Sequence, residues 1–308
     1  MTFQSTLKKS FTLSGITLHS GKISTITVHP APANTGIKFK RIDLGLPNHQ
    51  KVIACNVDNI TSSQLCTTLK NAYGHKVGMI EHLLSAFHGL SIDNALIDLD
   101  TDELPILDGS SKLIVEAIES VGMKELRSLR KVIKIIKPFM VGDENSYIKV
   151  LPSERFSIDY TIVYDHHLIK KQNYILNELN EIKYKDLISS SRTFGFEDEV
   201  IHLRNQGLIK GGSVDNAIVL SKEGILNTEA LRFDNEFVRH KILDAIGDIY
   251  LSGLGIVGSI EAYCAGHRRF QEMLKFMDND KSLWRVEDSI ERNITDSLYE
   301  NEEVRNYL

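Results

Sequence analysis

The feature that most constrains the fold of this chain is an apolar segment with helical periodicity that nonetheless contains ionisable side chains. The residues from Val77 to Leu90 are predominantly apolar, which predicts a helix that ends near Gly89. Glu81 and His82 interrupt the apolar run. A buried charge is costly unless it is paired or bound to a metal. Either one face of the helix is solvated, or these side chains meet partners inside the protein; the segment alone favours neither.

A second helix, predicted from Asn235 to Leu251, carries a polar face of distinctive composition. His240 and Asp244 are four residues apart, so their side chains stack on one face at a spacing that can chelate one metal ion. Asp248 extends the same face by another turn. An ordinary solvated face is the alternative, although such a face usually presents Lys and Glu. Alone, the His-x-x-x-Asp spacing is weak support for a metal site.

Together, the two helices supply a ligand set for a catalytic metal. His82, His240 and Asp244 provide two imidazoles and one carboxylate, which leave the fourth position of a tetrahedral site open for water. Zn²⁺ suits these donors and lowers the pKa of such a water toward about 7, and Fe²⁺ also accepts two His and a carboxylate. Glu81, adjacent to a candidate ligand in sequence, is placed to take the proton of that water.

Two shorter segments add candidates for proton donation and oxyanion stabilisation. His267 follows Gly266 directly after a predicted strand. If Asp248 holds it, His267 can stay protonated near neutral pH and protonate a leaving amine. Thr193 carries a hydroxyl that can hydrogen-bond a developing oxyanion. By itself, the first segment more often has a structural role, and the second indicates only a strand and a turn.

The composition excludes several classes of function. The net charge of −5 argues against general nucleic-acid binding, which needs clustered Lys and Arg. The N-terminus lacks the apolar core of a secretory signal, and no apolar run approaches the roughly 20 residues that span a bilayer. The 3 cysteines, without a C-x-x-C pair, indicate neither a disulfide framework nor a thiolate zinc site. We therefore expect a cytoplasmic protein without stable membrane insertion.

The 308 residues suffice for two domains, and each half repeats one order of elements: strands, then a helix, a strand and another helix. This predicts the α+β class, with two similar domains, each a sheet with helices on one face. The charged stretch from Lys124 to Lys131 is the candidate boundary, which divides residues 1–126 from residues 127–308. Further helices are predicted at residues 110–121, 198–206 and 267–276, and strands at 12–14, 23–28, 36–40, 95–99, 132–136, 147–151, 156–163, 217–220 and 256–262.

A short internal echo bears on duplication. The residues from Ser91 to Leu96 recur in similar form from Ser213 to Ile218, each time after a predicted helix and at the start of a predicted strand. Because Asp-Asn also suits any turn before a strand, duplication and coincidence weigh equally here.

Several blocks in a fixed order identify a family resemblance. The chain resembles the UDP-3-O-acyl-N-acetylglucosamine deacetylases of Gram-negative bacteria, which carry out the committed deacetylation of lipid A biosynthesis. The resemblance runs nearly end to end, and no single block would be specific. The blocks are Gly15 to Gly21, Glu81 to Ala86, Ile92 to Asn94, Pro105 to Ser110, Ser191 to Phe196, Gly211 to Ser213, Leu231 to Asp248, and Gly266 with His267.

The resemblance implies a fold and a set of roles. The family has two similar βααβ domains, with the helical layers sandwiched between the sheets and the active site between those layers. His82, His240 and Asp244 would be zinc ligands, Glu81 the general base, and His267 the general acid or electrostatic stabiliser. The remaining implied positions are Asp248 as support for the acid, Thr193 at the oxyanion, and Lys241, Phe194 and His19 at the substrate.

The resemblance also implies a passage for the acyl chain, from an insert that falls near residues 196–219. Apolar residues there suit such a passage and would equally suit an ordinary core; they are Ile201, Leu203, Leu208, Val214 and Ala217. Two positions depart from the family pattern. The first block has Ile16 and Thr17 where a hydrophobic residue and Gly are usual. Cys264 stands where some members have a basic residue, and Arg268 and Arg269 are the candidates to replace it at the diphosphate.

Three other interpretations remain open from the sequence. The chain can be a zinc amidohydrolase that acts on another acylated amino sugar. It can be a binding protein that has kept the fold, although such a protein would be expected to have lost Glu81 or a ligand, and all are present. It can be a structural protein whose His and Asp face water, which bound metal would exclude. The expected partner is the UDP-linked acylated glucosamine, and a monomer is the default expectation.

Overall fold

The computed structural model describes residues 2–61 and 65–289. Within them the chain is a mixed α+β protein built around two five-stranded sheets. One sheet has the strand order β2 (Phe11–Ile16), β3 (Ile23–Pro30), β9 (Ala95–Leu99), β4 (Ile37–Arg41), β5 (Val52–Ala54). The other has the order β12 (Phe139–Asp143), β13 (Ser146–Leu151), β19 (Ser259–Tyr263), β14 (Ser157–Val163), β15 (Lys171–Leu176).

The two sheets repeat one topology. In each, the first strand pairs antiparallel with the second and the second with the third, the third is parallel to the fourth, and the fourth is antiparallel to the fifth. The sequence echo does not mark this repeat. Its first copy leads into β9, whereas its second leads into β17 (Ile218–Leu220), and the topological counterpart of β9 is β19. The two asparagines of the echo also differ in their partners, because Asn94 accepts from the distant N–H of Thr35 whereas Asn216 accepts from the N–H of Ser213, three positions before it.

Smaller sheets connect these layers. Strands β6 (Ile60–Thr61), β7 (Thr68–Lys70) and β8 (Lys76–Gly78) form an antiparallel meander, and β16 (Phe194–Phe196) pairs parallel with β17. Strand β1 (Phe3–Leu7) pairs with β10 (Met123–Leu129), and β11 (Lys131–Ile135) lies between β18 (Gly255–Val257) and β20 (Trp284–Asp288). The charged stretch predicted as a boundary is thus mostly strand.

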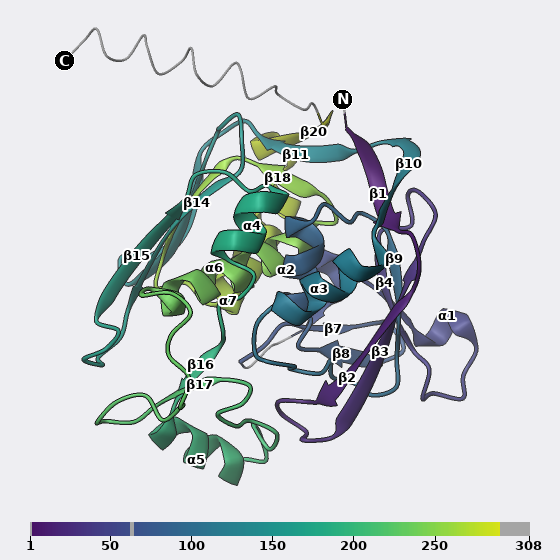
Figure 1. Cartoon of the computed structure of the whole chain (residues 1–308). Helices are drawn as coiled ribbons and strands as arrows, with labels where there is room; N and C mark the ends of the chain where they lie inside the picture. The colour runs from purple at the N-terminus through teal and green to yellow at the C-terminus, as the bar shows by residue number, and fades with distance from the viewer. Residues whose placement is uncertain (1, 62–64, 290–308) are drawn as a thin grey trace, which may run out of the picture.

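The helices fill the space between the two five-stranded sheets in the view of Figure 1, with the exception of α1 (Asn48–Lys51) and α5 (Glu197–Asn205). The pair with the most extensive contact is α2 (Glu81–Gly89) with α6 (Glu236–Ile249). Helix α6 also packs on β14 and β15. The others are α3 (Lys112–Val121), α4 (Glu181–Leu187) and α7 (His267–Asn279).

Two predicted element boundaries were wrong. The first helix begins at Glu81 rather than Val77, because Val77 and Gly78 belong to β8 and Met79 adopts a left-handed φ of 59°. The strand predicted at residues 256–262 is two strands, β18 and β19, which join different sheets. They separate at Gly258, where a Cβ would lie 2.7 Å from the side chain of Ile135.

Burial decides between the two interpretations of the polar helix faces. Every residue of α2 is buried, including Glu81 and His82. In α6 only Arg239 and Lys241 are not buried. The solvated-face alternative is therefore wrong for both helices, and their ionisable side chains meet partners inside the protein.

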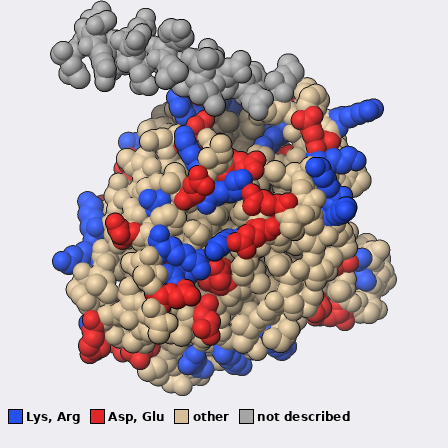
Figure 2. Space-filling view, viewed as in Figure 1, with Lys and Arg blue, Asp and Glu red and all other residues tan. Residues whose placement is uncertain are grey.

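On the face that Figure 2 shows, Lys and Arg are interspersed with Asp and Glu, and neither sign of charge covers a large area. None of the helices in residues 2–61 and 65–289 combines the length and the apolar character that crossing a bilayer requires.

The crossing of α2 and α6 is a backbone contact. A Cβ at Gly247 of α6 would lie 2.0 Å from the carbonyl oxygen of Glu81 at the start of α2. No side chain fits at that distance, so a glycine is required for the two helices to approach as they do. The contact fixes the spacing between Glu81, His82 and the polar face of α6.

Gly247→Ala should destabilise the fold by about 3 kcal/mol, because the helices must separate to admit the methyl group. Urea unfolding measures the loss, and turnover should fall with it as the site is pulled apart. Gly45→Ala is the matched control, since a Cβ at Gly45 meets nothing within 4 Å. Equal stability of the two variants would contradict the described crossing.

His88 lies at the other end of α2 and is a buried neutral imidazole. Its ring stacks on Tyr250 with 4.6 Å between centroids, and its Nδ1 lies 3.1 Å from the carbonyl oxygen of Ile246. Burial lowers the pKa of His88 from 6.5 to about 4. This side chain is therefore part of the core rather than of a site.

The low pKa of His88 predicts acid sensitivity of the fold. Above pH 6.5 the imidazole is neutral in both states; as the pH falls toward 4 the unfolded chain takes up the proton first, so stability is lost. The full loss is about 3 kcal/mol, of which about 2 kcal/mol falls between pH 7 and pH 5. Denaturant unfolding at both pH values should show that His88→Phe lacks this component. An identical pH slope in the variant would contradict the assignment.

Candidate active site

The α2–α6 crossing brings together the three candidate metal ligands. His82, His240 and Asp244 are all buried, and their ligand atoms lie within 4.8 Å of one another. The Nε2 atoms of His82 and His240 lie 3.5 Å and 3.4 Å from Oδ1 of Asp244. Two imidazole nitrogens and a carboxylate oxygen at this spacing suit a divalent transition metal.

The surroundings of these residues favour the ligand forms. Nδ1 of His240 lies 3.1 Å from the carbonyl oxygen of Ser191, so it is the donor and Nε2 is free to bind a metal. Burial lowers the pKa of His240 to about 3, which keeps the imidazole neutral. Burial alone would raise the pKa of Asp244, but neighbours that include His240 and Lys241 hold it well below its usual range. The donor set therefore fits a metal ion.

Beside the three candidate ligands lies a pair of proton carriers. Nε2 of His267, the first residue of α7, lies 3.8 Å from Oε1 of Glu81, and its Nδ1 lies 2.7 Å from Oδ2 of the buried Asp248. Burial alone would lower the pKa of His267, but the charge and hydrogen bond of Asp248 outweigh it and raise the pKa to about 10. Burial raises the pKa of Glu81.

Sequence reasoning missed one residue of this cluster. The backbone N–H of Thr67 donates to Oε2 of Glu81 at 3.1 Å, and its hydroxyl donates to Oδ1 of Asp248 at 2.5 Å. Thr67 comes just before β7, in the run Cys66-Thr67-Thr68, which carries no pattern of its own. Only the three-dimensional fold brings it to residues 14 and 181 positions away.

Two of the predicted substrate residues adjoin the candidate ligands. Nζ of Lys241 lies 2.6 Å from Oδ2 of Asp244 and 5.9 Å from the ring centroid of Phe194. The Phe194 ring also meets His240 edge-on, with 6.4 Å between centroids. Thr193 precedes Phe194 and is held by its backbone, since its N–H donates to Gly109 at 2.7 Å. A contact of its hydroxyl with an oxyanion stays a prediction.

The other predicted substrate residues lie outside this cluster. His19 is in the loop between β2 and β3, where its N–H donates to Glu103 and both ring nitrogens are buried without a partner among the described residues. Burial lowers its pKa. Ile201 is 59% exposed and Val214 47% exposed, Leu203 is half-buried, and no residue of α5 is buried. The interpretation of these insert residues as ordinary core is therefore wrong.

Arg268 and Arg269, the two arginines proposed to take the place of a basic residue at position 264, both pair with Glu272. Nε of Arg268 lies 2.9 Å from Glu272, and a terminal nitrogen of Arg269 lies 2.6 Å from the same carboxylate. Cys264 itself has a left-handed φ of 45°. Both arginines are therefore engaged by Glu272 rather than by the candidate ligands. The lysine that contacts a candidate ligand is Lys241, at Asp244.

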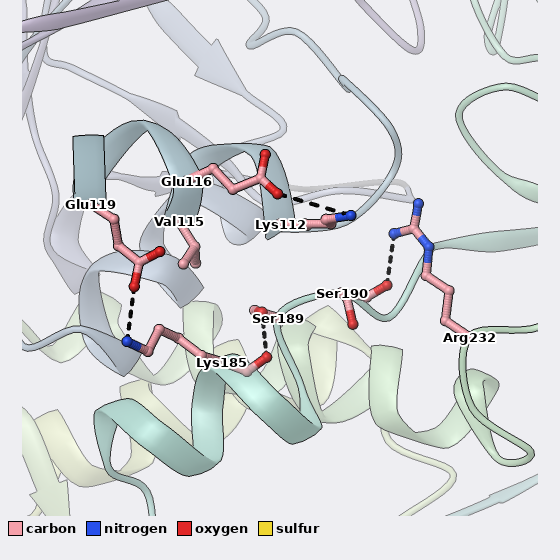
Figure 3. A pocket seen from close by; sticks show the side chains of 8 residues that line it. All are labelled: Lys112, Val115, Glu116, Glu119, Lys185, Ser189, Ser190 and Arg232. Carbon is pink, nitrogen blue, oxygen red and sulfur yellow. Dashed lines mark hydrogen bonds and ion pairs between the residues drawn. The ribbon is translucent and has the colours of Figure 1, made fainter. Parts of the chain in front are cut away.

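A surface pocket lies elsewhere, between α3 and α4 (Figure 3), with a volume of about 440 Å³. Its walls are polar and already paired, as Lys185 is 2.8 Å from Glu119 and Lys112 is 3.9 Å from Glu116. None of the predicted site residues lines it. The pocket is therefore separate from the cluster on α2, α6 and α7.

A buried group of two histidines and a carboxylate, flanked by a second carboxylate and a His–Asp pair, defines a candidate site of the metal-dependent hydrolase class. Comparison with known proteins identifies the family. The model of the family described as UDP-3-O-acyl N-acetylglycosamine deacetylase (LpxC) matches residues 4–278, so the chain belongs to that family. The resemblance predicted from the sequence is confirmed, and the protein is a hydrolase.

Individual relatives agree with this assignment. The chain is 42% identical over 284 residues to a protein of Wigglesworthia glossinidia brevipalpis. The aligned region covers 91% of this chain and 94% of the relative. The chain is 40% identical over 283 residues to a protein of Aliivibrio fischeri, at 91% and 92% coverage. A protein of Shewanella frigidimarina is 38% identical over 287 residues, at 93% of both chains. All three are named UDP-3-O-acyl-N-acetylglucosamine deacetylase.

Proposed function

We propose that this protein hydrolyses the N-acetyl group of UDP-3-O-acyl-N-acetylglucosamine to acetate and a free amine, the committed step of lipid A biosynthesis. The observation that carries the proposal is the buried group of His82, His240 and Asp244 with Glu81 beside it. Family membership supports the same reaction.

The group that His82, His240 and Asp244 would hold is Zn²⁺, with Fe²⁺ accepting the same donors. A bound Zn²⁺ would supply Lewis acidity, which activates water and polarises the amide carbonyl. The neutral imidazole of His240 and the ionised carboxylate of Asp244 support this role. Lys241, 2.6 Å from Asp244, adds a positive charge at the edge of the group.

Glu81 and His267 divide the proton transfers between them. Glu81 accepts a proton from the attacking water as its oxygen bonds to the amide carbon. His267, kept protonated by Asp248, donates a proton to the nitrogen as the carbon–nitrogen bond breaks. Water is consumed, and acetate and the amine are released.

Thr193, Phe194 and His19 complete the proposed site. The hydroxyl of Thr193 would stabilise the negative charge that develops on the carbonyl oxygen. Phe194, packed against His240, would form a wall of the substrate site. His19, which lies outside the cluster, would bind a polar group of the substrate through one of its buried, unpartnered ring nitrogens. Lys241 would bind the substrate through its charge.

An acyl passage in the insert predicts a strong preference for O-acylated substrate. Each buried methylene contributes about 0.8 kcal/mol, so burying five raises kcat/KM about 10³-fold over UDP-N-acetylglucosamine. Ile201→Asp and Val214→Asp should reduce only the rate with the acylated substrate. Ile182→Asp is the matched control, because Ile182 is also exposed but lies on α4. Equal kcat/KM for both substrates would contradict the passage.

We further propose that residues 1–126 and 127–308 form two similar domains with the site between their helical layers, and that the protein acts as a cytoplasmic monomer. The repeated strand order supports two domains. Because β10 spans the predicted boundary and pairs with β1, the boundary fits better at its end, near Arg130. Residues 290–308 of the second domain lie outside the described part of the chain.

A further inference from the structure

Thr67 is hydrogen-bonded to two carboxylates that flank the proton carrier His267. The residue is fully buried and stands one position before β7. Its backbone N–H donates to Glu81 and its hydroxyl donates to Asp248, two of the carboxylates beside His267, and the hydroxyl also lies 3.4 Å from Nδ1 of His267. None of these contacts belongs to the β-sheet pairing of β7, which begins at Thr68.

Each of the two carboxylates is held at one oxygen by Thr67 and turns the other toward His267. Glu81 accepts at Oε2, and its Oε1 lies 3.8 Å from Nε2 of His267. Asp248 accepts at Oδ1, and its Oδ2 lies 2.7 Å from Nδ1 of His267. A carboxylate with one oxygen fixed cannot rotate freely, so Thr67 sets the direction of both.

The arrangement also determines which atoms donate. The Thr67 hydroxyl has one proton, and its shortest contact is with Asp248 at 2.5 Å, against 3.4 Å to Nδ1 of His267. Asp248 then accepts two hydrogen bonds, one from Thr67 and one from Nδ1–H of His267. With Nδ1 engaged, Nε2 is the atom of His267 that faces Glu81 and the space beside the candidate ligands.

We propose that Thr67 is a positioning residue for the deacetylation, which acts through Asp248 to aim Nε2 of His267 at the leaving nitrogen. The inference rests on the proposed roles of Glu81 and His267. Thr67 itself contacts neither His82, His240 nor Asp244 in the described interactions, so its loss should leave metal binding intact.

The test compares Thr67→Val with Thr67→Ser. Valine keeps the shape but loses the hydroxyl, and both variants keep the backbone N–H on Glu81. We expect kcat to fall about 10- to 100-fold in Thr67→Val, with KM for UDP-3-O-acyl-N-acetylglucosamine and zinc content unchanged. Thr67→Ser should restore kcat to within about threefold, because a hydroxyl alone is required.

Thr6→Val is the matched control. Thr6 is a buried threonine on β1 whose hydroxyl donates to Asn94 and accepts from Ala31, and neither partner is one of the proposed site residues. It should lower the melting temperature while kcat stays at the wild-type value. A Thr67→Val enzyme that loses stability like Thr6→Val but keeps its kcat would overturn the proposal, as would loss of zinc.

A double-mutant cycle with Asp248→Asn tests whether Thr67 acts through Asp248. In that background Thr67→Val should change kcat less than threefold, since the carboxylate it orients is gone. Independent, multiplying losses would overturn the proposal. Failure of the proposed roles is distinguishable, because then Glu81→Gln and Asp248→Asn would themselves retain full turnover.

Discussion

Replacing Glu81 by Gln should lower kcat by two orders of magnitude or more while the protein keeps its metal. Glutamine has the same size and can accept the hydrogen bond from the Thr67 N–H with its one amide oxygen. Its amide nitrogen then faces His267 and the attacking water, and it cannot take a proton. The loss follows from the usual contribution of general-base catalysis, about 10²- to 10⁴-fold.

Three measurements separate the loss of a base from the loss of a fold. Zinc content and the melting temperature of Glu81→Gln should match the wild type, because the side chain is a neighbour of the candidate ligands and not one of them. Glu81→Asp keeps a carboxylate but withdraws it by one methylene. Its kcat should therefore lie between that of the wild type and that of Glu81→Gln. Turnover retained in Glu81→Gln would move the base elsewhere, with His267 the next candidate.

Replacing His240 or Asp244 by Ala should abolish both metal binding and turnover. Each change removes one of the three donor atoms that lie within 4.8 Å of one another, and two protein ligands hold a divalent ion poorly. Metal analysis after purification, circular dichroism and the deacetylation assay together measure the outcome. Asp244→Ala also leaves the Lys241 ammonium without its 2.6 Å partner, so some loss of stability is expected in addition.

His29→Ala is the control for these ligand variants. His29 lies on β3 and pairs with Asp98 at 3.4 Å, away from α2 and α6. It should keep full metal content and full activity. Normal occupancy and turnover in both His240→Ala and Asp244→Ala would exclude the assignment of His82, His240 and Asp244 as the ligand set.

The sequence could predict the site residues that are related by their spacing within one helix or by adjacency in the chain. His240 and Asp244 share a face because they are four residues apart on a helix, and Glu81 is found because it adjoins His82 in an apolar run. Most strands of the two large sheets were predicted from a pattern that is also local, whereas β5, β12 and β15 were not predicted.

What could not be predicted depends on packing between distant segments. Thr67 reaches Asp248 across 181 positions, and no local pattern encodes that contact. The start of α2 was placed too early because Val77 and Gly78 continue the apolar run but pair with β7 as strand β8. The sequence also could not show that Ile201 and Val214 are exposed, because apolar character alone does not distinguish an open passage from a core.

The backbone contact at Gly247 limits how the site can adapt to ions of different size. The carbonyl of Glu81 already fills the place of a Cβ at Gly247, so α2 and α6 can move apart but not closer together. Contraction around a small ion must therefore come from rotation of the His82, His240 and Asp244 side chains, whereas a larger ion can be admitted by separation of the helices. The scaffold resists compression at this contact, whereas separation of the helices is sterically open but costs packing energy, as expected for Gly247→Ala. Exchange of one divalent ion for a larger one should therefore register as a change in helix spacing and a loss of stability.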